Sequence, residues 1–317
     1  MTMSGVYGLL GGYIADRIWA DPPRMHPVSG FGRIASEIEN RLWADSYYRG
    51  VLFAGLLSGG AGAAAIAVDR LCRRTPTRIG VTAAITWAVL GGASLSREAR
   101  RVQAHLEHAD IAAARRQLRH LVGRHTDALG EDEVCRAVIE SVAENTSDAV
   151  VAPLVTGALA GIPGLVVYRV VNTLDAMVGY PRGRYRRFGW ASARLDDLLN
   201  LVPARVTALL AAVLAPTIGG SPIEAVRIWR RDAARHPSPN AGPVEAAFAG
   251  AMGVRLGGPN SYPDRVEERN RLGDGDQPVI ADITTAITLA DRIGTACIAA
   301  IVLLRALGPQ RVRGAAR

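Results

Sequence analysis

The sequence contains no lysine. All 37 of its basic residues are arginine, against 29 acidic residues, and the net charge is +8. A chain without lysine cannot form a lysine Schiff base with a carbonyl substrate, and it has no P-loop lysine to reach a nucleotide phosphate. Any bound phosphate must therefore be held by arginine side chains, backbone N–H groups or a metal ion.

Cysteine is also scarce, and several catalytic motifs are missing. The three cysteines, Cys72, Cys135 and Cys297, are far apart and form no CxxC pair, so we expect structural thiols and no disulfide framework. The chain has no G-x-S-x-G, H-E-x-x-H or P-loop motif. Its first ten residues carry no charged n-region and no A-x-A site, so a removed signal peptide is not expected.

Long apolar runs are abundant, with 49% hydrophobic residues and 34 glycines in addition. We expect an all-α, polytopic integral membrane protein with about four to six membrane segments, because a span needs about 20 apolar residues. The segment 149–171 contains Pro153 and the string Gly161–Gly164, so it should be broken or re-entrant. The spacing of residues 31–43 predicts an amphipathic helix. The candidate spans are 51–68, 79–95, 149–171, 198–218 and 283–304.

Polar segments separate these runs within a single predicted domain, 1–317. The segments 94–147, 172–198 and 222–278 are rich in arginine, so the positive-inside bias favours one shared cytoplasmic face for them. We expect these cytoplasmic loops to be helical, with helices over 96–109, 111–122 and 131–145 in the first, and turn-rich loops at 236–242 and 256–262 in the last.

Acidic residues lie beside the apolar runs, where charge is costly unless it has a function. Glu140, Glu144 and Asp148 are spaced i, i+4 and i+8, so on a regular helix they share one face. Such acids repel one another, and Mg²⁺ bound together with substrate phosphates would relieve the repulsion. Asp175 follows Asn172 at i+3. The alternative is a solvated face followed by ordinary helix capping.

Arginines lie between the acidic strings. Four arginines occur in the six positions 182–187, a pattern that suits phosphate or carboxylate oxygens but also the positive flank of a membrane span. Arg194, Asp196 and Asp197 follow closely. His26 and His236 each precede a proline in a polar loop, a setting more typical of structural than of catalytic histidines.

These strings together resemble the CobD/CbiB family of cobalamin-biosynthesis proteins, the adenosylcobinamide-phosphate synthases. The resemblance runs from about residue 8 to 305. The segments that carry it are Asp21–Val28, Glu140–Asp148, Asn172–Tyr180, Phe188–Asp197, His236–Gly242 and Leu256–Tyr262.

The resemblance implies a multi-pass protein of the cell membrane whose active face is cytoplasmic. It implies ATP and Mg²⁺ as cofactors, and ligation of (R)-1-amino-2-propanol or its O-phosphate to the free propionate of adenosylcobyric acid. Membrane lipid and other corrin-pathway enzymes are the further partners expected, and nucleic acid is not. The expected metal ligands are Glu140, Glu144, Asp148 and Asp175. The expected phosphate- or substrate-binding residues are Arg184, Arg186, Arg187, Arg194, His26, Asn145, Asn172 and Asn240. Proton transfer is expected at Asp196, Asp197 or His236, with the loops of His26 and His236 closing over one site.

Two other functions remain compatible with the sequence. Asn172–Asp175 weakly resembles the acidic motifs of Mg²⁺-dependent membrane transferases that act on diphosphates. A non-enzymatic corrinoid transporter or scaffold would use the intramembrane acids as relays.

Overall fold

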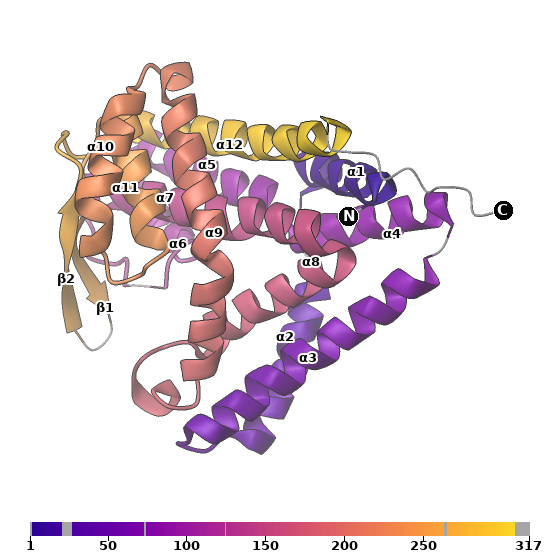
Figure 1. Cartoon of the computed structure of the whole chain (residues 1–317). Helices are drawn as coiled ribbons and strands as arrows, with labels where there is room; N and C mark the ends of the chain where they lie inside the picture. The colour runs from indigo at the N-terminus through magenta and orange to yellow at the C-terminus, as the bar shows by residue number, and fades with distance from the viewer. Residues whose placement is uncertain (1, 21–26, 73, 124, 263–264, 308–317) are drawn as a thin grey trace.

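The structure is a computed structural model that describes residues 2–20, 27–72, 74–123, 125–262 and 265–307, with the side chains of residues 260–267 left out. Helices dominate it, joined by short turns, and one β-hairpin is the exception (Figure 1). The N-terminal helices are α1 (Met3–Trp19), α2 (Pro27–Leu42), α3 (Tyr47–Leu71), α4 (Thr75–Val89), α5 (Gly92–Glu107) and α6 (Ile111–Leu118). The C-terminal ones are α7 (Glu131–Thr146), α8 (Ala152–Val178), α9 (Trp190–Leu214), α10 (Pro222–Asp232), α11 (Ala241–Met252) and α12 (Ile280–Leu307).

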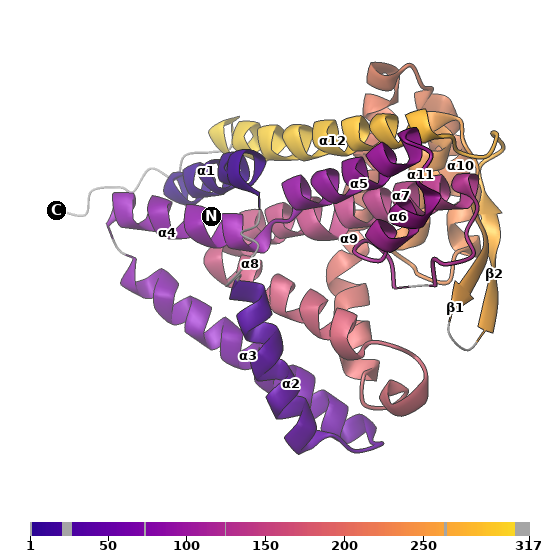
Figure 2. The same cartoon turned by 180° about the vertical axis from the view of Figure 1, so that it is seen from behind.

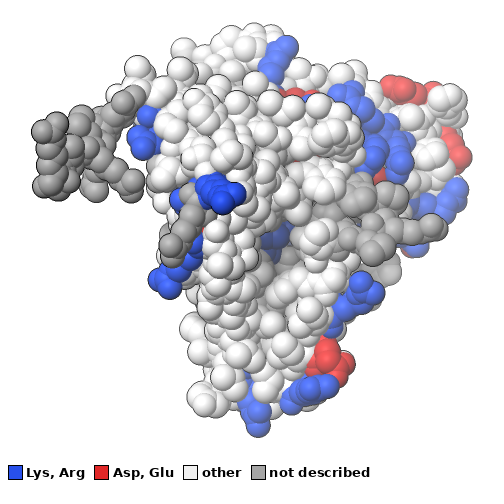
Figure 3. Space-filling model, turned by 90° about the vertical axis from the view of Figure 1, so that its right-hand side faces the viewer, with Lys and Arg blue, Asp and Glu red and all other residues white. Residues whose placement is uncertain are grey.

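Within the described residues, five helical stretches are long and apolar enough to cross a membrane, which confirms the predicted class. Only 22% of the apolar window of α3 is buried inside the protein, so most of that helix is free to face lipid. Figure 3 shows a face that is largely without charged side chains, as a lipid-facing surface requires. The stretches are Tyr47–Leu71, Thr75–Glu107, Glu131–Val178, Trp190–Ile218 and Ile280–Leu307.

The predicted break in the segment 149–171 is confirmed, and it makes α8 a re-entrant hairpin. Gly161 has φ +67° and ψ −145°, a conformation open in practice only to glycine, and Pro163 follows it. The chain turns back here, so that the Tyr168 hydroxyl donates to the Asp148 carbonyl oxygen at 2.9 Å. In a straight helix, 20 residues would separate these groups by about 30 Å. Figure 1 shows the two halves of α8 folded against each other.

Two helices form an arm beside this hairpin. Figures 1 and 2 show α2 and α3 lying together, apart from α1 and α4. Phe53 and Leu57 of α3 pack with Leu174 and Val178 from the second half of α8, and Phe188 of the following loop completes the cluster. The arm therefore packs against the C-terminal end of α8 and the loop that follows it.

The polar half of the protein is a cap built on α5, α6, α7, α10 and α11. Here the turn-rich loop predicted at 256–262 was wrong, because these residues form the first strand of an antiparallel hairpin, whereas residues 236–240 do form a loop, before α11. Strand β1 (Leu256–Tyr262) pairs with β2 (Arg265–Leu272), with a bulge between Leu256 and Gly258. Of the described side chains of β2, those of Glu268 and Arg271 are exposed, that of Arg269 is half-buried, and that of Leu272 is buried in the core beneath.

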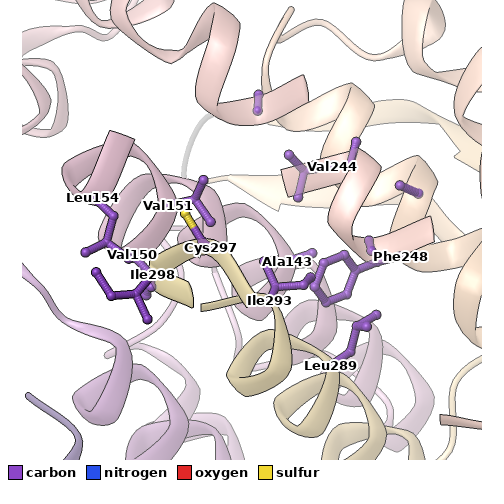
Figure 4. Close-up of a cluster of buried hydrophobic side chains, with 14 of the residues drawn as sticks. Ala143, Val150, Val151, Leu154, Val244, Phe248, Leu289, Ile293, Cys297 and Ile298 are labelled. Carbon is purple, nitrogen blue, oxygen red and sulfur yellow. The ribbon is translucent and has the colours of Figure 1, made fainter. Parts of the chain in front are cut away.

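A continuous apolar core joins the cap to the membrane helices. In Figure 4, Phe248 of α11 lies beside Leu289 and Ile293 of α12, while Val151 and Leu154 lie around Cys297. All three cysteines are buried free thiols, in agreement with the expected structural role. The packing fixes α11 relative to the turn that precedes α8, and residues from both line the cavity described below.

The conformation at Gly161 gives a first prediction. Replacing Gly161 by alanine should destabilise the hairpin by about 1–3 kcal/mol, because a Cβ atom strains this backbone region. A lower thermal midpoint of the purified protein would report it. Gly80→Ala in α4 is the control, because Gly80 is helical and nothing lies within 4 Å of an added Cβ atom. A midpoint no lower for Gly161→Ala than for Gly80→Ala would contradict the strained hairpin.

A buried carboxylate in the cap gives a second prediction. Asp232 is fully buried and accepts hydrogen bonds from Arg231 at 2.7 Å, Arg235 at 3.2 Å and the Gly273 N–H at 3.0 Å. The bond from Arg231 is the main cause that lowers the pKa of Asp232 below its usual value. Asp232→Asn should lower the stability at pH 7 by about 1–3 kcal/mol.

The pH dependence follows from the sign of that pKa shift. A lowered pKa contributes stability above the unfolded-state value of about 3.9, and this contribution is lost as the pH falls through the folded-state value. The difference between wild type and Asp232→Asn, measured by thermal unfolding, should therefore be constant near neutrality and shrink below about pH 4. A difference that does not change down to pH 3 would rule out this role for Asp232.

Candidate functional site

A polar cavity of about 620 Å³ lies where the cap meets the ends of α7, α8 and α9. Its lining comes from five parts of the chain that are far apart in sequence. These are the end of α7 with the turn after it, the end of α8 with the loop 179–186, the start of α9, the loop 236–241, and Arg269 of β2. The cavity thus collects most of the polar strings noted in the sequence.

One wall of the cavity carries five carboxylates, which are Glu144, Asp148, Asp175, Asp196 and Asp197. Asp148 is within electrostatic range of Asp196, Glu144 and Asp175, and Arg169 is a cation that also acts on it. Amide groups stabilise the cluster from behind, since Asn200 and Asn172 donate to the two oxygens of Asp196 at 2.9 and 3.3 Å. The cluster is therefore held together against its own repulsion.

A local irregularity directs Asp148 into this wall. Residues Ser147–Val151 form a π-helical turn between α7 and α8. Such a turn inserts an extra residue and is frequent at functional sites. The Tyr168 hydroxyl holds it by donating to the carbonyl oxygen of Asp148, and it also contacts Oδ1 of Asn200 at 2.9 Å.

Basic side chains line the same cavity. Arg182, Arg186, Arg194 and Arg269 are among its lining residues, and Arg194 donates to Asp197 at 3.2 Å. The four arginines come from the loop after α8, from α9 and from β2. The result is one cavity lined by both carboxylates and guanidinium groups, an arrangement that suits a cation and an anion bound side by side.

A histidine loop closes one end. Nδ1 of His236 lies 3.1 Å from the Ser238 N–H, and Nε2 lies 3.4 Å from Nη1 of Arg269 and 3.7 Å from Oε1 of the buried Glu245. Asn240 donates to the carbonyl oxygen of Asp197 at 2.8 Å and accepts from Arg205 at 2.9 Å. This loop is thereby fastened to the acidic start of α9.

Some predicted residues lie elsewhere. Glu140 is buried behind the wall, where it accepts from the N–H of Gly257 at 2.9 Å, so the three acids of 140–148 do not share one face. Successive residues on a helix turn by about 100°, so eight residues accumulate about 80° of rotation, and the π turn adds to it. Asn145 donates to Ser141 of its own helix at 2.9 Å. Asn172 does not line the cavity and instead donates a hydrogen bond to Asp196.

The arginine patch is also divided. Arg184 pairs with Glu39 and Arg187 with Asp45, so both face α2 and the turn after it and neither lines the cavity. Arg269 is the lining residue that the sequence reasoning missed. Its signal is the alternating charged run over 265–272, where we predicted no strand. His26 lies outside the described residues, so its predicted place over the site is untested.

The fit of a metal ion can be judged from the donor set. In the part of the chain that the structure describes, no three histidine, cysteine, aspartate or glutamate side chains are arranged to hold a metal ion on their own. Mg²⁺ is usually held by one or two carboxylates together with substrate phosphates and water. Asp148, Asp175 and Asp196 fit that mode, because their mutual repulsion leaves a site that favours a cation.

Comparison with known proteins agrees with the resemblance seen in the sequence. The family model described as "CobD/Cbib protein" matches residues 9–290. A "Cobalamin biosynthesis protein CobD" of Mycobacterium tuberculosis (strain ATCC 25618 / H37Rv) is 49% identical over 300 residues, covering 94% of this chain and 96% of the relative.

Proteins of the same name are similar in more distant bacteria. The one from Geobacter metallireducens is 44% identical over 287 residues, covering 89% of this chain and 90% of the relative. The one from Halalkalibacterium halodurans is 37% identical over 300 residues, with 92% and 94% covered. No solved structure matches the chain. The extent of these matches shows that the chain belongs to the CobD/CbiB protein family.

Proposed function

We propose that this protein acts in cobalamin biosynthesis as an adenosylcobinamide-phosphate synthase. In this reaction ATP drives the formation of an amide between the free propionate of adenosylcobyric acid and aminopropanol or its O-phosphate. The cobalamin pathway is supported by the family and by the printed names of its relatives. The ligase chemistry is supported by one observation, the five carboxylates and four arginines that line one cavity.

The first chemical step needs an anionic centre to be stabilised. Transfer of the γ-phosphoryl group of ATP to a propionate oxygen forms a P–O bond, releases ADP and gives an acyl phosphate. Arg182, Arg186 and Arg269 are placed to pair with the phosphate oxygens, as arginine forks do. Asp148 and Asp175 would hold Mg²⁺, which neutralises phosphate charge when bound.

The second step forms the amide. The amine nitrogen attacks the carbonyl carbon, the C–N bond forms, the C–O bond to phosphate breaks, and inorganic phosphate leaves. The amine must lose a proton to a base within reach. Asp197 is better placed than His236 for this, because both ring nitrogens of His236 already have neighbours, Nδ1 the Ser238 N–H and Nε2 the guanidinium of Arg269. Asp196 is already bound by two amides and is best assigned to orienting the cluster.

The location of the cavity suits a substrate from the cytoplasm. It opens between the polar cap and the ends of the apolar helices, so ATP and a corrinoid can enter from water while the protein stays in the cell membrane. We therefore place the active face on the cytoplasmic side, where ATP is supplied.

The central prediction is an activity. Purified protein given adenosylcobyric acid, Mg-ATP and aminopropanol phosphate should yield the amide with one ADP per product, measured by chromatography and mass spectrometry. Parallel reactions with free aminopropanol identify the amine substrate. Transfer from a labelled prenyl diphosphate instead of ligation would favour a membrane transferase. Corrinoid binding without ATP-dependent product would favour a transporter or scaffold.

A second prediction concerns the acidic wall. Asp148→Asn and Asp175→Asn should each lower kcat by about 100-fold or more, because a neutral amide binds Mg²⁺ poorly. The Mg²⁺ concentration for half-maximal activity should rise as well. Asp127→Asn is the control, since Asp127 pairs with Arg119 far from the cavity lining. Near-normal turnover and Mg²⁺ dependence in both variants would remove these carboxylates from the metal site.

A further inference from the structure

The loop after α8 sorts its arginines onto two sides. Arg182 and Arg186 line the cavity, whereas Arg184 and Arg187 point to the arm formed by α2 and α3. Arg184 lies in a short 3₁₀ turn, Gly183–Tyr185, in which Gly183 has φ +55°. Arg182 precedes this turn, and Arg186 and Arg187 follow it. The orientation of the cavity-facing pair therefore depends on what holds the other side of the loop.

Glu39 of α2 holds that side. Its residue is 7% exposed, and its Oε1 accepts from the Tyr185 hydroxyl at 2.8 Å and from Arg184 at 3.0 Å. Trp43, one turn further along the chain, donates its Nε1–H to the carbonyl oxygen of Arg184 at 3.2 Å, and the Arg184 guanidinium lies 4.9 Å from the Trp43 ring centre. A buried carboxylate with two side-chain donors and a neighbouring indole fixes both the side chain and the backbone of the turn.

Apolar contacts support the same connection. Phe188 at the end of the loop is fully buried against Phe53 of α3, with ring centres 5.0 Å apart. The backbone at Gly50 approaches Phe188 so closely that an added Cβ atom would lie 2.0 Å from its carbonyl oxygen. Phe188 can anchor the end of the loop, but it does not set the direction of the arginines before it. That direction needs a charged partner.

We propose that Glu39 is a positioning residue for phosphate binding, which holds the turn 183–185 so that Arg182 and Arg186 face the cavity. The proposal rests on the proposed function. Glu39 is not among the residues that line the cavity. Without the charge of Glu39, Arg184 and Tyr185 lose the acceptor that fixes the turn, so Arg182 and Arg186 are no longer held toward the cavity.

The kinetic test uses Glu39→Gln in the full chain. We expect the KM for the phosphorylated substrates to rise about tenfold while kcat changes by less than about threefold, because ground-state phosphate binding is weakened and the reacting groups stay in place. Glu37→Gln is the matched control, since Glu37 lies on the same helix in an exposed pair with Arg41. Arg184→Gln, which removes the same ion pair from the exposed partner, should reproduce the KM effect even where Glu39→Gln folds poorly. An unchanged KM in both variants, or a fall in kcat alone, overturns the proposal.

Two readouts do not depend on turnover. Trypsin cleaves after arginine, so cutting within residues 182–187, located by mass spectrometry, should be faster in Glu39→Gln than in wild type and in Glu37→Gln. The affinity for Mg-pyrophosphate, measured by calorimetry, should fall about tenfold in the same variant. If wild type shows no ligation but both readouts change as expected, the proposed function fails and the positioning role stands. If wild type ligates and both readouts are unchanged, the positioning role fails and the function stands.

Discussion

Electrostatic repulsion among five carboxylates on one cavity wall is the constraint around which the rest of the structure is arranged. Asp148 is acted on by Asp196, Glu144 and Asp175, and Arg169 is a cation within range. Like charges that lie close together disfavour one another's ionised forms unless opposite charge or hydrogen bonds compensate. The amides of Asn172 and Asn200 and the arginines that line the cavity supply part of that compensation. The Mg²⁺ ion proposed above would supply the remainder.

Irregular helix geometry brings these charges together. Asp148 and Asp175 are 27 residues apart, a separation that a straight helix would extend to about 40 Å. The π turn at Ser147–Val151 directs Asp148 into the cavity, and the reversal at Gly161 returns α8 so that Asp175 lines the same cavity. Irregular backbone at membrane depth is tolerated only where it is buried or lines a cavity. Both irregularities therefore belong to the machinery that forms the site.

The sequence was informative where one local property decides the structure. Apolar run length predicted the spans, and glycine with proline predicted the reversal at Gly161, because backbone freedom at that position is a property of the residue itself. The sequence was less informative about the direction in which a side chain points, because that direction depends on tertiary contacts. Glu140 was grouped with Glu144 and Asp148 by assuming that all three share one face of a regular helix. In the structure Glu140 points away from the other two and accepts a hydrogen bond from the N–H of Gly257. Arg269 was missed because glycine, proline and asparagine near β1 suggested loops, although the alternating charges of β2 fit a strand.

The arginines of residues 182–187 show most clearly that a sequence pattern does not predict which way neighbouring side chains point. Composition alone made residues 182–187 one anion-binding patch, but the structure divides it between a cavity and a helix arm. The division depends on an acid that lies about 145 residues earlier in the chain, and no spacing rule connects the two. The contact between Glu39 and this loop also joins the membrane-facing arm to the polar cavity. The arm includes a helix able to cross the membrane, while the loop it holds carries cations that face the proposed phosphate site. The position of those cations is therefore fixed relative to the bilayer, which is what a membrane enzyme with water-soluble, anionic substrates requires.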